Sequence, residues 1–443
     1  MTITKSSTKM KEKSPSKDAL IIGGGVSGMQ AALDIANQGF HVYLVEKSPS
    51  IGGRMAQIDK TFPTLDCSAC ILTPKLSEVG RHPDIELFTY SEVKEVTGEE
   101  GNFTVEVLKK ARMVEEELCS GCGQCIEVCP IEVPNEFDQN LGFRKAVYMP
   151  FPQATPSVVT VDMENCIECS RCVTACEREA INHSQRDETI TLNVGAIIIA
   201  TGYNLFDVSE YSRFGYSKFP NVIHAMEYER LINAAGPTAG HMIRLSDGKI
   251  PQSIAFIQCV GARDVNKGVP LCSRICCMYG IKNAVMAKEH EPDTDVTVYY
   301  LDIRAFGKDF EQFYERAKTR FGVKFIRGRV GEVVEDPESN NLIVTVEDTE
   351  TGEVLQVEHD LVVLSPGIQP PPELAELVEK IGLDVDENGY VEARDTLSTP
   401  VDTTISGVYV CGCAEGPKDI PDSVSEGSAA AMRATISLND GGD

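Results

Sequence analysis

The chain has 443 residues, 42% of them hydrophobic, and 41 Lys and Arg against 67 Asp and Glu give it a formal net charge of −26. Such a length predicts two to four domains, and the acidity argues against nucleic-acid binding, which needs basic faces for phosphates. We find no apolar run long enough for a secretory signal or a membrane span. We therefore expect a cytoplasmic protein without direct membrane insertion, which would meet a membrane only through a partner. In that reducing compartment, 16 Cys favour metal binding over disulfides.

A glycine-rich turn follows the first strand that the sequence predicts. Residues 19–22 are apolar, residues 29–38 repeat apolar side chains at helical spacing, and a second strand over 41–46 ends in Glu46. The turn between the first two elements has the pattern G-x-G-x-x-G, which allows close approach of a pyrophosphate and tight helix packing. Its glycines are Gly23, Gly25 and Gly28. Because Glu46 stands where a carboxylate can hold ribose hydroxyls, we expect a dinucleotide site; the alternative is a plain glycine turn.

Two further motifs favour FAD over NAD. Gly52-Gly53-Arg54 resembles the second glycine pair of FAD-binding two-domain disulfide oxidoreductases and amine-oxidase-like flavoproteins. Ala200-Thr201-Gly202, at the end of a buried strand over 194–200, resembles the ATG element of the same group.

The remaining elements follow the order of a two-lobe flavoprotein. Residues 85–108 predict antiparallel strands, and a second α/β lobe begins with a strand over 253–258. After that strand only Gly261 is available for close phosphate approach, so we expect a lobe without an NAD site. The further elements are expected at 279–290 and 309–321 (helices), at 296–301, 323–327, 342–347, 354–358 and 361–364 (strands), and at 407–411 (strand) and 423–437 (helix) of the first lobe.

Two consecutive cysteine runs carry the strongest motif. Each run has the spacing C-x2-C-x2-C-x3-C, in which three thiolates bind one [4Fe–4S] cluster and the fourth binds the other cluster. The expected ligand sets are Cys119, Cys122, Cys125 and Cys176 for one cluster, and Cys129, Cys166, Cys169 and Cys172 for the second. The alternative is zinc, which prefers two Cys-x-x-Cys pairs far apart.

A second group of cysteines stands in the second lobe. Its members are Cys259, Cys272, Cys276 and Cys277. Spacing alone leaves three interpretations open, namely buried thiols, zinc and a third iron–sulfur cluster.

Three segments resemble one family. Residues 64–74, 272–282 and 412–421 are similar to the A subunit of heterodisulfide reductase and its relatives, among them the A subunit of the quinone-interacting membrane-bound oxidoreductase complex. The resemblance covers about residues 19–437. It implies a cluster on the second cysteine group, and partners that include B- and C-type subunits and an electron-donating hydrogenase, formate dehydrogenase or ferredoxin-like protein. A homodimer within the complex is an open alternative.

The resemblance also implies the fold class: α/β, with a thioredoxin-reductase-like two-lobe FAD flavoprotein and an inserted ferredoxin domain that holds two [4Fe–4S] clusters. The expected domains are a disordered tail (1–18), a first FAD-binding part (19–110), the inserted ferredoxin domain (111–192), an FAD-binding return (193–250), a second Rossmann-like lobe (251–365) and a C-terminal FAD-binding part (366–443). The residues expected at the FAD are Gly23, Gly25, Ser27, Gly28, Glu46, Lys47, Gly53, Arg54, Thr201, Gly202, Gly412, Cys413 and Ile420.

Five residues keep alternative roles. Lys282, five residues after Cys277, would direct its ammonium at the flavin and stabilise an anionic reduced form; the alternative is a solvated lysine. Cys413 stands where related flavoproteins place an aspartate, which puts that contact with FAD in doubt. Cys67 and Cys70 are either a redox dithiol or, as we prefer, buried or ligand-assisting thiols, and Cys411 has no assigned role.

We therefore expect an oxidoreductase: an FAD- and iron–sulfur-dependent electron-transfer subunit of a heterodisulfide-reductase-type complex. It would relay electrons between a disulfide- or quinone-reducing partner and a donor subunit, and bifurcation at the flavin is an open question. One alternative is a free-standing NAD(P)H- or ferredoxin-dependent reductase of a small substrate. Another is a scaffold whose clusters are structural.

Overall fold

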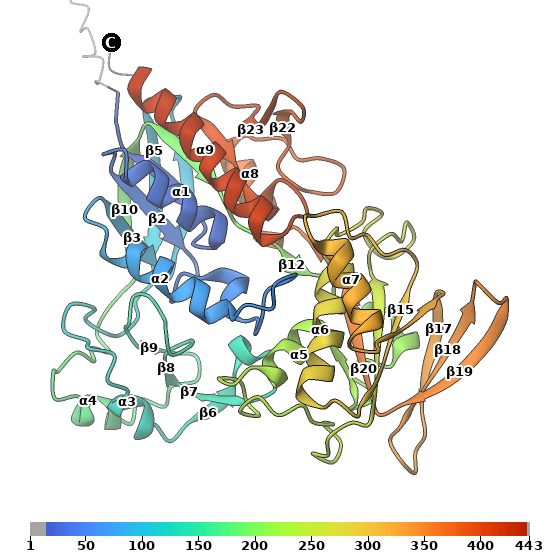
Figure 1. The fold of residues 1–443 in the computed structure, drawn as a ribbon. Coiled ribbons are helices and arrows are strands. Elements are labelled where there is room, and N and C mark those ends of the chain that lie inside the picture. Colours follow the sequence, from blue (N-terminus) through green and yellow to red (C-terminus); the bar gives the residue numbers. More distant parts are fainter. Residues whose placement is uncertain (1–14, 441–443) are drawn as a thin grey trace, which may run out of the picture.

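A seven-stranded sheet forms the first lobe of the computed structural model, which describes residues 15–440 (Figure 1). In spatial order its strands are β22 (Ala393–Asp395), β23 (Thr399–Thr403), β24 (Val408–Val410), β11 (Ala196–Ile199), β1 (Ala19–Ile22), β2 (Val42–Glu46) and β3 (Ile85–Thr89). The strands from β24 to β3 are parallel, and β22 and β23 add an antiparallel edge.

The two faces of this sheet are covered differently. Helices α1 (Val26–Ala36), α2 (Ser68–Arg81) and α9 (Ile420–Asp440) pack on one face, where Ala19 and Ile21 point. Leu20 and Ile22 point to the other face because side chains alternate along a strand. An antiparallel sheet and one helix cover that face, with the elements β4 (Ser91–Thr97), β5 (Phe103–Lys109), β10 (Glu188–Val194) and α8 (Pro372–Ile381).

The predicted antiparallel strands over 85–108 are partly wrong. β4 and β5 are antiparallel, but β3 pairs in parallel with β2, with Val45 opposite Phe88. Parallel neighbours need a crossover connection, and α2, a helix that the sequence analysis did not predict, provides it.

The cysteine-rich insert leaves the first lobe between two paired strands. Lys109 at the end of β5 lies opposite Glu188 at the start of β10, so the insert begins and ends at one place. Its elements are short: α3 (Gln124–Glu127), β6 (Glu132–Pro134), β7 (Phe143–Lys145), β8 (Val147–Tyr148), β9 (Thr160–Val161) and α4 (Arg171–Ala175). Cysteines from both runs form its small core together with Val, Ala and Ile.

The second lobe is built on a five-stranded parallel sheet. Its strands are β13 (Val222–His224), β20 (Leu361–Pro366), β14 (Ser253–Val260), β15 (Asp295–Tyr300) and β16 (Lys324–Arg327). One face carries the helices α5 (Ala225–Ile232), α6 (Cys276–His290) and α7 (Phe310–Thr319), and the other carries the antiparallel strands β17 (Val330–Glu335), β18 (Leu342–Asp348) and β19 (Glu353–His359). β13 and α5 precede residue 251, so this lobe takes in residues from before the expected boundary.

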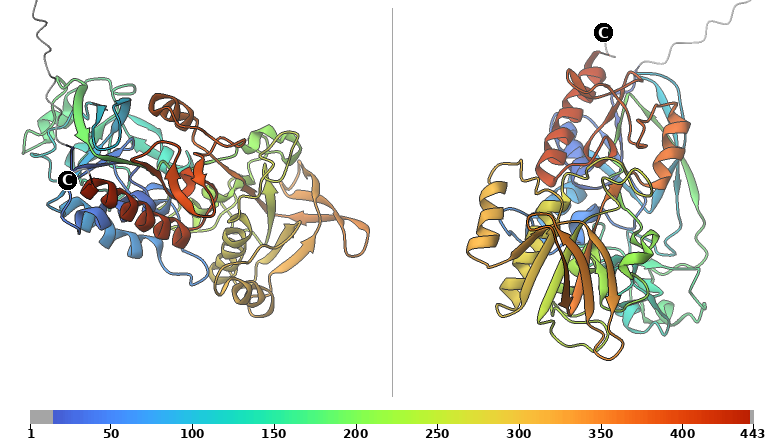
Figure 2. Two further views of the ribbon diagram at one scale, coloured as in Figure 1. Left: turned by 90° about the horizontal axis from the view of Figure 1, so that it is seen from above. Right: turned by 90° about the vertical axis from the view of Figure 1, so that its right-hand side faces the viewer.

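The two lobes lie side by side, with β17–β19 at the end of the second lobe that is far from the first (Figure 2). The chain crosses between the lobes in an antiparallel pair, β12 (Asn204–Leu205) and β21 (Ile368–Gln369).

Most of the expected tail, residues 1–14, lies outside the described residues. Within the described part, the backbone N–H of Ser16 donates to the carbonyl of Gly101 at 2.8 Å, and the Asp18 carbonyl accepts from the N–H of Gly195 at 2.8 Å. Residues 16–18 therefore pack against the first lobe.

Candidate functional site

A cavity of about 510 Å³ lies where the two lobes and the insert meet. The first lobe contributes the glycine-rich turn, the second contributes residues of α5 and α6, and the insert contributes Phe137, Tyr148 and Phe151. Most of the residues expected at the FAD line it: Gly23, Gly25, Ser27, Glu46, Lys47, Gly53, Arg54, Thr201, Gly202, Cys413 and Ile420. Gly28 and Gly412 are not in the lining.

Two glycines of the first turn have the two different roles that the motif predicts. A Cβ atom on Gly25 would meet no atom within 4 Å, so the backbone there is open to the cavity. A Cβ atom on Gly28 would lie 1.9 Å from the carbonyl oxygen of Gly23. Gly28 thus permits the close packing of α1 on the turn, which explains why it lies behind the wall.

Glu46 is fixed by the loops on either side of it. Its Oε2 accepts a hydrogen bond from the N–H of Gly24 at 2.8 Å, and its Oε1 accepts one from the N–H of Ser48 at 2.7 Å. These bonds hold the carboxylate at the edge of the cavity, at the end of β2.

The wall of the cavity suits a large cofactor with polar groups. The hydroxyl of Thr201 is buried and has no hydrogen-bond partner among the described residues, although it lines the cavity. The first residues of α9 also line it, and a helix N-terminus favours negative charge. The volume falls in the range of cofactor pockets. The residues present therefore fit FAD.

Lys418 is a functional candidate that the sequence analysis missed, although it belongs to a segment that carries the family resemblance. It lines the cavity with its side chain only 2% exposed, and its Nζ lies 2.7 Å from Glu415 Oε2 and 2.6 Å from Glu426 Oε2. Burial disfavours the ammonium, but the two carboxylates outweigh it and raise the pKa of Lys418. Glu426 also accepts from the N–H of Gly412 at 3.0 Å, so Lys418 helps to hold the loop before α9.

Lys282 lies behind the cavity wall. It is 1% exposed, so the solvated alternative is wrong. Its ammonium forms a buried ion pair with Glu229, which lines the cavity and accepts from the N–H of Asp59 at 3.0 Å. Whether the ammonium acts on the flavin stays a prediction.

The structure gathers the cysteines of the insert into the two sets that the spacing predicts. Cys129, Cys166, Cys169 and Cys172 line one small cavity of about 10 Å³, together with His183. Burial raises the pKa of Cys125 to about 12, and the neighbouring thiols of Cys119, Cys176 and Cys122 add to the shift. The fourth cysteine of each run thus lies with the other run.

The arrangement of the cysteines bears on which metal these sets fit. Across residues 15–440, no three Cys, His, Asp or Glu side chains are arranged around a single metal ion. A cubane takes one thiolate at each of four irons, so its ligands stand further apart than those of one zinc ion. The all-cysteine sets fit [4Fe–4S] clusters, while the role of each cysteine as a ligand stays a prediction.

The cysteines of the second lobe converge at the carboxyl end of β14. Burial raises the pKa of Cys259 to about 11, with Cys277 and Cys272 adding to the shift and Arg263 opposing it. Cys276 and Cys277 are the first residues of α6. Cys276 is also close to the large cavity, because Tyr279 lines that cavity and shares the carbonyl of Pro366 with it, at 2.7 Å from the hydroxyl and 3.7 Å from the thiol.

Gly261, the one glycine after β14 that could approach a phosphate, lies under an aromatic ring. A Cβ atom there would be 2.1 Å from Cδ1 of Phe206. The turn is therefore packed where the turn at Gly25 is open.

Four cysteines lie outside these groups, and for Cys67 and Cys70 the structure differs from the role that we preferred. Cys67 and Cys70 are joined by a disulfide at the start of α2, and Cys70 is exposed, so the expectation of two buried thiols is wrong. Cys411 is fully buried. Cys413 lines the large cavity and donates from its thiol to the carbonyl of Lys418 at 3.4 Å.

Family models and solved structures agree with this architecture. A pyridine nucleotide-disulphide oxidoreductase model matches residues 279–427, a 4Fe-4S dicluster domain matches 118–181 and an NAD(P)-binding Rossmann-like domain matches 21–81. Thioredoxin reductases from T. acidophilum and Lactococcus lactis share the fold, each with a TM-score of 0.53 and 16% identity, over 95% and 96% of this chain and 99% of theirs. Fold and sites together define a two-lobe flavoprotein fold whose large cavity fits FAD and whose insert matches a 4Fe-4S dicluster domain.

Relatives with assigned names narrow this class. The A subunit of the H(2):CoB-CoM heterodisulfide,ferredoxin reductase of Methanothermobacter marburgensis is 54% identical over 420 residues, which are 95% of this chain and 64% of that protein. The iron-sulfur A subunit of the CoB--CoM heterodisulfide reductase of Methanocaldococcus jannaschii is 53% identical over 425 residues, 96% of this chain and 65% of the relative. The chain belongs to the family of heterodisulfide reductase A subunits. It spans just under two thirds of the length of these relatives.

The structure also bears on membranes. Among residues 15–440, no helix combines the length and apolar character needed to cross a bilayer.

Proposed function

We propose that the chain is an electron-transfer subunit of a heterodisulfide-reductase-type complex. It would relay electrons between a partner that reduces a disulfide or a quinone and a donor subunit. One observation carries this proposal: two cysteine sets lie directly behind the wall of the flavin cavity, one in the insert and one in the second lobe. FAD exchanges two electrons and each cluster exchanges one, so their combination converts between the two modes.

On the side of the insert, a two-residue strand separates the two sites. Val147 of β8 lines the small cavity shared by Cys129, Cys166, Cys169 and Cys172. The next residue, Tyr148, lines the flavin cavity. Because neighbours on a strand point to opposite faces, β8 is a thin wall between the two sites.

On the side of the second lobe, the wall is the first turn of α6. Ile275 and Tyr279 line the flavin cavity, and Cys276, between them in sequence, is 4% exposed. A third cluster on Cys259, Cys272, Cys276 and Cys277 would therefore lie directly behind this wall. The flavin would then have one route toward the insert and another toward the second lobe.

The partners belong to the same proposal. The name of the Methanothermobacter marburgensis relative mentions H(2), CoB-CoM heterodisulfide and ferredoxin. For this chain we expect B- and C-type subunits on the accepting side, and a hydrogenase, a formate dehydrogenase or a ferredoxin-like protein as donor. We place such a complex in the cytoplasm, with any contact to a membrane made by a partner.

The experiment is a reoxidation assay under anaerobic conditions. The purified chain is reduced with dithionite, the excess is removed, and CoB–CoM heterodisulfide is added with or without B- and C-type subunits. We expect flavin absorbance to return only when both subunits are present, and we expect no bleaching of the oxidised chain by NADH or NADPH. Rapid reoxidation by the heterodisulfide alone, or bleaching by NAD(P)H, would support a free-standing reductase instead.

A further inference from the structure

Six arginines surround the cysteine group of the second lobe, although the chain as a whole carries a net charge of −26. We call them the arginine rim: Arg213, Arg263, Arg274, Arg304, Arg327 and Arg329. Arg263 is half-buried and the other five are exposed. All six lie at or near the carboxyl ends of β14, β15 and β16.

A shared ion-pair partner links two arginines of the rim, and two more lie close to them or to the cysteine group. Asp302 pairs with Arg263 at 2.8 Å and with Arg327 at 3.5 Å. Arg304 lies close to Asp302 and Cys277. Its positive charge adds to the lowering of the Asp302 pKa by Arg263, and it opposes the rise that burial causes in the pKa of the Cys277 thiol. Arg274 lies next to Cys272, whose sulfur accepts from the Arg274 N–H at 3.3 Å.

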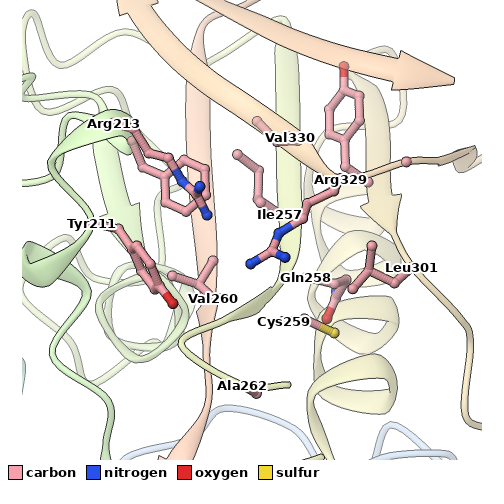
Figure 3. A pocket seen from close by; sticks show the side chains of 13 residues that line it. Tyr211, Arg213, Ile257, Gln258, Cys259, Val260, Ala262, Leu301, Arg329 and Val330 are labelled. Carbon is pink, nitrogen blue, oxygen red and sulfur yellow. The ribbon is translucent and has the colours of Figure 1, made fainter. Parts of the chain in front are cut away.

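Arg213 and Arg329 complete the rim at a small hollow of about 20 Å³ that Cys259 also lines. Figure 3 shows their guanidinium groups turned toward one another above Ile257 and Val260. Arg329 pairs with Asp264 at 3.0 Å, and Arg213 lies over the rings of Tyr211 and Phe214. Two like charges that converge on one hollow are stabilised by an anionic group between or above them.

The rim keeps an excess of positive charge after its internal ion pairs are taken into account. The carboxylates that pair with it are Asp264, Asp302 and Asp422. Six arginines against three aspartates leave an excess of three positive charges. An oxidised cluster held by the four thiolates of the cysteine group would carry a charge of about −2, so about one positive charge would remain on an otherwise acidic molecule.

Exposed apolar side chains accompany these charges. Phe306 is 56% exposed and lies under the Arg274 guanidinium, 5.0 Å from it, and Val265 is 81% exposed. Arginine and aromatic residues are enriched in protein interfaces, where apolar contacts hold a complex that charges have oriented.

We propose that the arginine rim is the docking surface for an acidic protein that carries a one-electron centre. The identity of this partner rests on the proposed function, because a one-electron carrier needs a redox group close to the surface, and the cysteine group behind the rim would supply it. The positive rim would orient an acidic carrier, while the acidic remainder of the chain would repel it. Arg304, Arg327 and Phe306 would lie in the contact.

The test measures binding of a small acidic two-cluster ferredoxin to the anaerobically purified chain by isothermal titration calorimetry. The test variant is Arg304→Glu with Arg327→Glu. The matched control is Lys249→Glu with Lys324→Glu, which reverses two exposed charges of the same lobe before β14 and at the start of β16, at the opposite end of the sheet.

We expect the rim variant to bind about 10-fold more weakly or worse at low salt, and the control to stay close to the wild type. Wild-type binding should weaken as sodium chloride rises from about 50 to about 300 mM, because salt screens exposed charges. Iron content and visible spectra of each variant show whether its clusters are intact. If the rim variant loses iron, Arg213→Glu repeats the test at a side chain stacked on Tyr211 and Phe214.

Three results would overturn the docking surface: unchanged binding by the rim variants, an equal loss in the control, or a wild-type dimer that the rim variant loses while ferredoxin never binds. Failure of the proposed function looks different. In that case ferredoxin binds through the rim, yet the reduced chain is not reoxidised by heterodisulfide and its B- and C-type subunits.

Discussion

A buried carboxyl at the start of α5 makes the stability of the second lobe depend on pH. Glu227 is 8% exposed, and its oxygens accept from the N–H of His224 at 2.7 Å and from the hydroxyl of Tyr216 at 3.0 Å. Burial raises the pKa of Glu227 to about 7 from its usual 4.5. The native state therefore favours the protonated carboxyl, and the stability that this gives is present below pH 4.5 and lost as pH rises through about 7.

Glu227→Gln should remove this dependence while keeping the shape of the side chain. A shift of that size corresponds to about 3 kcal/mol, so the free energy of unfolding of the wild type should fall between pH 5 and pH 8 by about that much relative to the variant. His224, whose pKa burial lowers to about 4, contributes equally to both proteins. Urea unfolding of the cofactor-loaded chain at the two pH values measures the difference, and parallel pH profiles would refute the assignment.

Lys418 gives a second prediction at the scale of one residue. Lys418→Met leaves Glu415 and Glu426 without their cation beside the flavin cavity, and breaking a buried pair in this way costs about 3–5 kcal/mol. We expect the variant to retain FAD poorly on gel filtration, at least about 10-fold worse than the wild type. Lys418→Arg keeps the charge and should restore most of the retention. Equal FAD content in Lys418→Met and wild type would show that the lysine has no part in the site.

At the scale of elements, the crossed pairing of the two cysteine runs can be tested by double substitution. If Cys176 serves the same cluster as Cys125, Cys125→Ala with Cys176→Ala should cost one cluster, or about four irons per chain. Cys125→Ala with Cys129→Ala should cost both clusters of the insert, or about eight irons. Iron analysis after anaerobic purification decides the matter, and the opposite order of losses would mean that each run binds its own cluster.

The sequence predicted correctly those elements whose signal lies within a short stretch of the chain. The turn at Gly25 and the strand that ends in Glu46 carry their signal within a few residues, and so do the cysteine runs. The parallel pairing of β3 depends on α2, whose amphipathic pattern is interrupted by Pro74, and this is why sequence reasoning missed both. Lys418 and Tyr148 were missed for another reason: their positions at the cavity arise only when distant segments come together.

At the scale of the whole molecule, the insert and the second lobe are more than additions to a flavoprotein. Both contribute to the wall of the same cavity, Tyr148 from one side and Tyr279 from the other. Composition predicted that the 16 Cys serve metal binding, and the structure adds where most of them lie relative to the large cavity. Four cysteines fall outside that expectation: Cys67 and Cys70, which form a disulfide, and Cys411 and Cys413, which belong to neither group.

The central claim is that a flavin and several clusters share one electron-transfer unit in this chain. A potentiometric EPR titration of the anaerobically purified chain tests it most directly, with iron and flavin counted in the same sample. We predict one FAD, about twelve irons and three reducible [4Fe–4S] centres, two from the insert and one from Cys259, Cys272, Cys276 and Cys277. Fewer than about eight irons, or zinc with no paramagnetic centre on reduction, would contradict the account.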